Sequence, residues 1–248
     1  MQKFNPSAPG YASVENAMKA LSVLWLWTCA MTSAYAAPDA REVLRIGAND
    51  EIAQLYAPYQ KFVEAAFQDT PWRIEWVNLP LARSIRAANE GSIDGDFIRI
   101  KDVTEIYSNL VAVPWPLNRQ RFYLFIPTTL DCPDTSNIDK LVVGKLLGIS
   151  AYDHFPENIK RNMVFSPNLE SYVNMAMAHR IDGIAITDDH YKKISKKFDV
   201  DLKKCSDHML YEAVTYMMLN IKHRDKIPRI VEAFSKHAGL LPTEDQAY

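Results

Sequence analysis

The chain has 248 residues, of which 48% are hydrophobic and 23% are charged, and this ordinary globular composition excludes a disordered or fibrous protein. Lys and Arg number 28 against 30 Asp and Glu, so the net charge of -2 creates no strong field that would draw the protein onto nucleic acid or an anionic membrane. We therefore expect a small-molecule partner and no nucleic acid.

The first part of the chain, residues 1–36, is predicted to be a secretory signal peptide. Lys19 precedes a short apolar run, and the Ala-Tyr-Ala triplet at 34–36 has the small residues that precede a cleavage site. The apolar run is shorter than the roughly 20 residues needed to span a bilayer. We expect cleavage after Ala36 and a mature chain outside the cytoplasm, with translation starting at Met1 or Met18.

Two cysteines, Cys132 and Cys205, remain in the mature chain. In an oxidising compartment a disulfide is favoured over a metal site or a catalytic thiol. The alternative is a pair of unpaired, buried thiols.

Strands and helices alternate in the first part of the mature chain. The expected elements are a strand at 43–47, a helix around 59–67, a strand at 73–77, a helix at 81–89 and a strand at 93–98. Pro58 is tolerable only near the first turn of its helix, and Gly91 is expected to end the next one. This order is typical of a mostly parallel sheet with helices on its faces.

A second α/β series follows the apolar strand expected at 121–126. Its elements are strands at 145–149, 163–165 and 183–187, with helices after Pro156 and at 169–178. Four lysines between 192 and 197 alternate with Tyr191, Ile194 and Phe198, which predicts a helix with a solvated face and an apolar underside. The chain closes with a strand at 213–219 and a helix around 227–234 that ends at Gly239.

The most economical arrangement uses 121–126 and 213–219 as two connections between lobes, so that the last helix returns to the first lobe. A cleft then lies between two hinged α/β lobes. Ligands of open α/β sheets bind outside the carboxyl ends of the strands, so the turns after the strands are the expected walls of the cleft.

Four segments resemble, in order, the bacterial family 3 extracellular solute-binding proteins. They are Leu-Arg-Ile-Gly at 44–47, Ala-Ala-Asn-Glu-Gly-Ser-Ile-Asp-Gly-Asp at 87–96, Ile-Asp-Lys-Leu-Val-Val-Gly-Lys-Leu-Leu-Gly-Ile at 138–149 and Arg-Ile-Asp-Gly at 180–183. The resemblance covers nearly all of the mature chain and rests on the order and spacing of these segments.

The resemblance implies an α/β, two-lobed periplasmic-binding-protein type II fold with two hinge connections. Lobe 1 would comprise 37–121 and 213–248, lobe 2 would comprise 127–212, and the hinge strands would be 122–126 and 213–219. Such proteins close on a small ligand, a motion for which hinged periplasmic binding proteins are a standard example, and hand it to an inner-membrane permease. We expect a periplasmic monomer.

An arginine is expected to hold the ligand's anionic group. Amino-acid binders of this family carry one about a dozen residues beyond the aspartate that matches Asp94, but this chain reads Asp-Val-Thr-Glu-Ile at 102–106. Arg99 and Arg83 both stand near strand ends, and either can supply a two-pronged guanidinium. We expect both to be solvated arginines facing the cleft.

Further ligand contacts are expected in the turns around the cleft. These candidates are Asn49, Asp50, Asp96, Trp115, Ser150, Thr187 and Asp188. Each has a structural alternative: helix capping for Asp50 and Asp188, backbone hydrogen bonding for Asp96, and core packing for Trp115.

No catalytic motif, phosphate-binding glycine loop or clustered metal-ligand spacing occurs in the sequence, and His190 is interpreted as a solvated histidine at a helix start. We expect a solute-binding protein that takes a small polar ligand, anionic or zwitterionic and amino-acid-like, without catalytic residues, cofactor or metal. Two alternatives remain open. One is a periplasmic lyase or dehydratase on the same scaffold, with His154 or Asp96 as general acid or base, and the other is a ligand-sensing periplasmic protein.

Overall fold

One mixed β-sheet runs through the part of the chain that the structure, a computed structural model, describes: residues 39–134 and 138–242, without the side chains of 50–54 and 206–208. The strand order is β2-β1-β3-β9-β5-β8-β6-β7, and β4 pairs with β9 beside this path. The signal peptide predicted at 1–36 lies outside the described residues.

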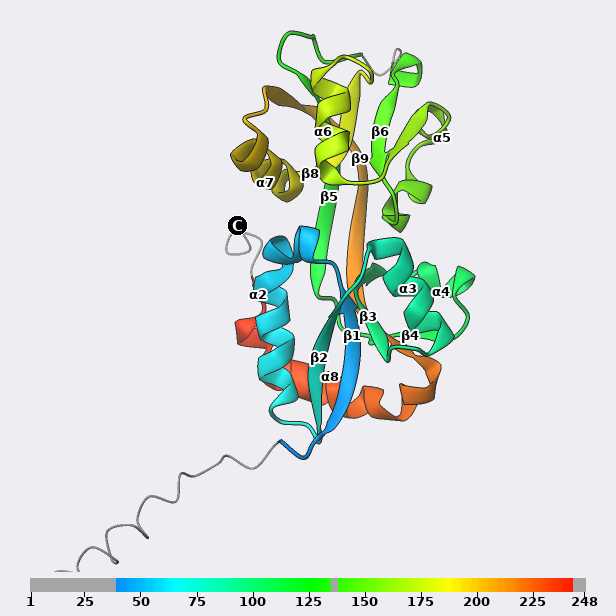
Figure 1. The fold of residues 1–248 in the computed structure, drawn as a ribbon, viewed down its shortest axis with the longest axis vertical. Helices are drawn as coiled ribbons and strands as arrows, with labels where there is room; N and C mark the ends of the chain where they lie inside the picture. Colours follow the sequence, from blue (N-terminus) through cyan, green and yellow to red (C-terminus); the bar gives the residue numbers. More distant parts are fainter. Residues whose placement is uncertain (1–38, 135–137, 243–248) are drawn as a thin grey trace, which may run out of the picture. The chain divides into compact units, whose positions relative to one another are not determined.

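The first lobe contains β1 to β4 and the helices around them (Figure 1). Its elements are β1 (Glu42–Ala48), α2 (Asp50–Phe67), β2 (Trp72–Asn78), α3 (Leu81–Glu90), β3 (Gly95–Ile100), α4 (Val103–Ile106), β4 (Leu110–Ala112), the 3-10 helices η3 (Ile221–Lys226) and η4 (Ala238–Leu240), and α8 (Ile227–Lys236). β1 pairs in parallel with both β2 and β3, as the alternating pattern predicts.

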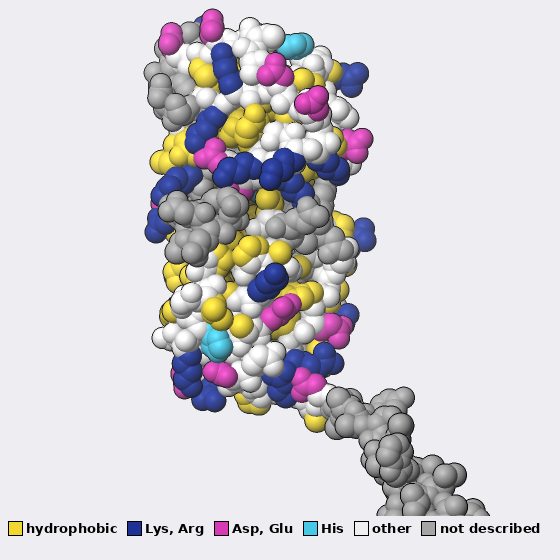
Figure 2. Space-filling view, turned by 90° about the vertical axis from the view of Figure 1, so that its left-hand side faces the viewer, with side chains coloured by type: hydrophobic (Ala, Val, Ile, Leu, Met, Phe, Trp, Pro, Cys, Tyr) yellow, Lys and Arg dark blue, Asp and Glu magenta, His cyan; other side chains and the backbone are white. Residues whose placement is uncertain are grey.

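The second lobe repeats this plan with three parallel strands. Its elements are η1 (Ile138–Lys140), β6 (Val143–Leu146), η2 (Ser150–His154), α5 (Glu157–Lys160), β7 (Met163–Ser166), α6 (Leu169–Met177), β8 (Gly183–Thr187) and α7 (Asp188–Phe198). β6 lies between β7 and β8. Ile194 of α7 is fully buried, and Figure 2, which looks onto the side that carries α7, shows Lys and Arg side chains in a row across it. The predicted solvated face and apolar underside of this helix are confirmed.

Two long strands belong to both lobes. β5 (Asn118–Pro127) and β9 (Leu202–Asn220) pair antiparallel with each other along their length and run from one lobe into the other (Figure 1). The predicted hinge segments 122–126 and 213–219 lie within them, and the exact lobe boundaries remain a prediction. The first half of β9 was not predicted, because 202–208 carries several charged and polar residues instead of an apolar run.

The expectation that Pro58 stands near the start of its helix is wrong, because α2 begins at Asp50 and continues through the proline. The missing amide hydrogen and the ring at Pro58 disfavour a continuous helix. The apolar face after it, which includes Phe62, Val63 and Phe67, is buried in a core shared with Phe234 of α8, and this packing holds the helix together. Gly239 likewise does not end α8, which stops at Lys236.

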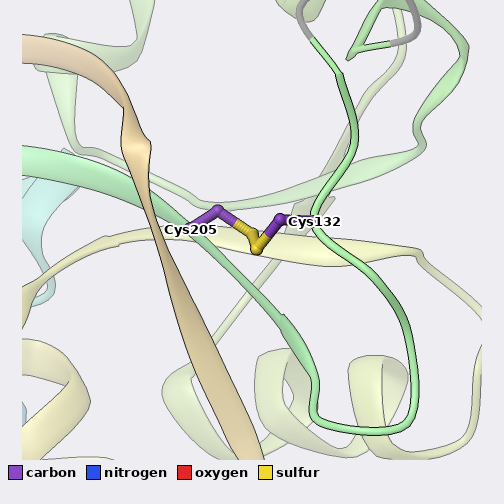
Figure 3. Close-up of a disulfide and its surroundings, with 2 residues drawn as sticks. All are labelled: Cys132 and Cys205. Atoms are coloured by element: carbon purple, nitrogen blue, oxygen red, sulfur yellow. A yellow bond between two sulfur atoms is a disulfide. The ribbon is translucent and has the colours of Figure 1, made fainter.

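The predicted disulfide between Cys132 and Cys205 is confirmed (Figure 3). Cys132 lies in the exposed loop after β5, and Cys205 is buried in β9. The bridge therefore joins the two shared strands at their second-lobe end and closes a loop with a sequence separation of 73 residues.

None of the helices within 39–134 and 138–242 is long and apolar enough to cross a membrane. Within the same residues, no group of three or more His, Cys, Asp or Glu side chains lies close enough together to bind a metal ion.

Candidate functional site

A cavity of about 50 Å³ lies where the carboxyl ends of the strands from both lobes meet. This is the position at which α/β sheets bind ligands. Its polar lining residues are Asn49, Tyr56, Gln60, Ser84, Asp96 and Arg99 of the first lobe, Gln120 and Thr215 of the shared strands, and Ser150 and His190 of the second lobe. Side chains of both lobes therefore face the same cavity.

A β-bulge in β3 turns Arg99 into this cavity. Residues three apart in a regular strand point to opposite faces, yet Arg99 Nε donates to Asp96 Oδ2 at 2.6 Å. The register of β3 against β9 shifts between these two residues, and Ile98 between them has a φ of 58°. A β-branched residue in the left-handed region is strained, and such strain is concentrated at functional sites. The bulge thus places the carboxylate and the guanidinium on the same side.

The Arg99 guanidinium links the two lobes. Nη2 donates to the carbonyl oxygen of Leu81 in the first lobe at 2.7 Å, and Nη1 donates to the carbonyl oxygen of Gly148 in the second lobe at 3.0 Å. The side chain is only 5% exposed, so the expectation of a solvated arginine is wrong for Arg99. These bonds use three of its five N–H groups and leave one on each terminal nitrogen.

The Asp96 carboxylate compensates the charge of Arg99. Asp96 is 1% exposed and accepts hydrogen bonds from the Ser84 hydroxyl at 2.7 Å, the Phe97 amide at 3.0 Å and Arg99. Gly47 allows Ser84 to approach, because a Cβ atom at this position would lie 2.0 Å from Ser84 Oγ. The buried ion pair therefore adds no net charge to the cavity.

The lobes touch beside this ion pair. Gly148 follows β6 with a φ of 89°, and a Cβ atom there would lie 2.7 Å from the backbone nitrogen of Ala82 at the start of α3. Ser150, two residues further on, begins η2 and lines the cavity. The second-lobe turn at 147–150 thus closes against the first lobe.

His190 faces the cavity from the second lobe. Thr187 ends β8 and caps α7 by accepting from the His190 amide at 3.3 Å, and its Oγ1 also lies 2.8 Å from His190 Nδ1. The side chain is 2% exposed, so the interpretation of a solvated histidine is wrong, and burial lowers its pKa to about 4. Nε2 is buried and has no hydrogen-bond partner among the described residues.

Tyr56 and Gln120 form a further polar pair in the lining. Gln120 Nε2 donates to Tyr56 Oη at 2.6 Å. Burial raises the pKa of Tyr56 well above its usual range, so the phenol keeps its proton.

The structure brings some of the sequence candidates to the cavity and not others. Four candidates line the cavity: Arg99, Asp96, Asn49 and Ser150. Thr187 does not line it but is hydrogen-bonded to His190, which does. The backbone of Asp50 begins α2, but its side chain lies outside the described residues.

Three candidates lie elsewhere. Arg83 is exposed and makes no hydrogen bond or ion pair with the described side chains, whereas Asp188 pairs with Lys204 at 2.7 Å. Trp115 packs edge-on against Phe234 in the first-lobe core, with ring centroids 6.5 Å apart. Sequence reasoning missed Tyr56, Gln120 and His190 as lining residues, although the position of His190 just after a strand was the available indication.

No family model and no curated protein matches this chain. Solved structures do match. A histidine kinase sensor domain with similarity to periplasmic binding proteins has a TM-score of 0.67 at 10% identity, covering 82% of this chain and 95% of that chain. The substrate-binding protein of an amino acid ABC transporter has a TM-score of 0.63 at 11% identity, covering 80% and 95%.

The arginine-, lysine-, histidine-binding protein ArtJ from Geobacillus stearothermophilus has a TM-score of 0.64 at 10% identity, covering 80% of this chain and 90% of that chain. Identities this low carry information about the fold alone. The chain has the two-lobed α/β fold of periplasmic binding proteins that the resemblance of its sequence implies.

Proposed function

We propose that this protein is a solute-binding protein whose two lobes close on a small polar ligand. The observation that carries the proposal is the cavity at the strand ends, which both lobes line with buried polar groups. Concave sites with a few converging polar groups are the usual places for small ligands. Two of the structural neighbours are described as amino-acid-binding proteins, which favours an amino-acid-like ligand.

The charge balance of the site favours a zwitterionic ligand over an anionic one. Arg99 was expected to attract an anion, but Asp96 neutralises it at 2.6 Å inside the protein. The two N–H groups that remain on the terminal nitrogens of Arg99 can still hold a carboxylate. A zwitterion that brings its own positive charge adds no net charge to a neutral cavity.

Ligand entry requires the lobes to separate. A cavity of about 50 Å³ has room for roughly four water molecules, and sites for small molecules are usually several times larger. The contacts that must open are those of Gly148 with Arg99 and with the start of α3. The strands β5 and β9, which cross between the lobes, are the elements that would bend.

We further propose that the protein delivers its ligand to an inner-membrane permease. It is periplasmic after removal of residues 1–36, and it is a monomer. A ligand-sensing role is the second candidate, favoured by the match to a kinase sensor domain. We propose no catalysis. His154 does not line the cavity but stacks on Tyr211, and Asp96 is held by Arg99.

A thermal-shift screen of the mature chain against the common amino acids tests the proposal. A ligand at 100 times its dissociation constant stabilises the folded state by roughly 2.7 kcal/mol. X-ray scattering with and without the stabilising compound then measures closure. A screen in which no amino acid raises the melting temperature would contradict an amino-acid-like ligand, and binding to a separate permease would distinguish transport from sensing.

A further inference from the structure

We propose that His190 Nε2 and the Tyr56 hydroxyl form a subsite for an uncharged hydrogen-bond acceptor of the ligand, so that the protein prefers amino acids with a side-chain amide to those with a side-chain carboxylate. This inference rests on the proposed function and assigns a role to His190 and Tyr56, which line the same cavity as Arg99 and Asp96.

The hydrogen bond to Thr187 determines what His190 offers to the cavity. Thr187 Oγ1 accepts the His190 amide hydrogen, and its own hydrogen needs an acceptor. His190 Nδ1, 2.8 Å away, is that acceptor when it carries a lone pair. The ring proton then resides on Nε2, the buried atom without a partner among the described residues. His190 consequently presents an N–H donor.

Tyr56 presents a second donor from the other lobe. Its oxygen accepts from Gln120 Nε2 at 2.6 Å, and we assign its own hydrogen to the ligand. Both rings line the same cavity of about 50 Å³. An amide carbonyl oxygen has two lone pairs, and we assign one of them to each donor.

The electrostatics of this subsite disfavour charged groups. Both donors are neutral, because burial keeps a proton off the second nitrogen of His190 and keeps the proton on Tyr56. Arg99 is already neutralised by Asp96, and one further charge of each sign acts here, Asp189 on Tyr56 and Lys193 on His190. A side-chain carboxylate would thus be desolvated at two neutral donors. A side-chain ammonium would face the N–H of His190 and the O–H of Tyr56, and two donors do not accept a hydrogen bond from a third.

Nuclear magnetic resonance of the mature chain tests the donor assignment directly. Histidine labelled with ¹⁵N reports which ring nitrogen carries the proton, and the spectrum of His190→Gln identifies the signals of His190. We expect the proton on Nε2 at pH 7. A proton on Nδ1 would make Nε2 an acceptor and would overturn the proposal.

Binding measurements test the selectivity. The probes are L-asparagine against L-aspartate and L-glutamine against L-glutamate, measured by calorimetry on the parent, His190→Ala, Tyr56→Phe and the control His237→Gln, a histidine near the chain end that pairs with Asp69. We expect the amide to bind more tightly within at least one pair. Each subsite change should weaken this binding by roughly 10- to 100-fold, as expected when a buried hydrogen bond is lost, and the control should not.

The outcomes separate the two proposals. If the parent and the folded variants His190→Ala and Tyr56→Phe bind the amide equally well, the subsite is overturned and the proposed function stands. The same conclusion follows if the parent binds only aspartate or glutamate. If the parent binds none of these four probes but the wider amino-acid screen yields a ligand, the amide preference is overturned alone. If that screen also yields none, the amino-acid-like ligand is overturned with it.

Discussion

Replacement of Arg99 by Met should destabilise the protein, although an exposed arginine would contribute little. The guanidinium lies 2.6 Å from the Asp96 carboxylate, and both side chains are at most 5% exposed. Removing one partner of a buried ion pair typically costs about 3–5 kcal/mol, because the remaining charge is left without compensation. Asp96 keeps its bonds from Ser84 and Phe97, so we expect a value near the lower end, about 3 kcal/mol.

Two further variants show whether the uncompensated charge is the cause. Asp96→Asn combined with Arg99→Met removes both charges, and this double variant should be more stable than Arg99→Met alone. Arg83→Met removes an exposed arginine that forms no ion pair with the described residues, and it should change the free energy of unfolding by no more than about 0.5 kcal/mol.

Urea unfolding at neutral pH, followed by circular dichroism, measures these free energies. X-ray scattering of the folded Arg99→Met variant should also show a larger radius of gyration, because the bond from Nη1 to the Gly148 carbonyl between the lobes is lost. A stability within 1 kcal/mol of the parent would refute the argument, and so would a double variant less stable than the single one.

Three other predictions concern pH, the disulfide and the lobe contact. His190 has a pKa near 4 when folded and 6.5 when unfolded. The stability that its neutral form contributes is therefore present above pH 6.5 and falls by up to about 3 kcal/mol towards pH 4. Urea unfolding at several pH values should show that His190→Gln lacks this part of the loss. Reduction of the bond between Cys132 and Cys205 should destabilise the chain by up to about 4 kcal/mol, given the 73-residue separation, and thiol titration of the unfolded, unreduced protein should find no free thiol from this pair. Gly148→Ala places a Cβ atom 2.7 Å from the Ala82 nitrogen at a φ of 89° and should enlarge the radius of gyration, while an unchanged radius would show that the contact adapts.

The order of elements could be predicted because local patterns dictate it. The helix at 81–90 ends at Gly91, whose left-handed backbone lets its N–H donate to carbonyl oxygens of the last helical turn. The parallel strands are short apolar runs bounded by turns. The pairing of Cys132 with Cys205 could be predicted because they are the two cysteines of the mature chain and that chain is expected in an oxidising compartment. None of these predictions needed knowledge of contacts between lobes.

The environment of the site could not be predicted, because it depends on such contacts. Arg99 was correctly expected near a strand end, but the bulge at Ile98 places a β-branched residue in a conformation that its type disfavours, and no local pattern indicates this. His190 was interpreted as a solvated histidine because it stands at a helix start. Its burial arises where α2 of the first lobe approaches α7 of the second, a long-range contact.

The path of the chain through the two lobes sets an order of completion during synthesis. The second lobe is an insertion: β6, β7 and β8 lie within 143–187 and can pair soon after they emerge. The first lobe begins earlier but must wait for the far end of β9 and for α8, which complete its sheet and core more than 100 residues after β3. Contacts of such long sequence separation form slowly. The lobe made from the middle of the chain is therefore expected to be complete, and sealed by its disulfide, before the lobe that contains β1.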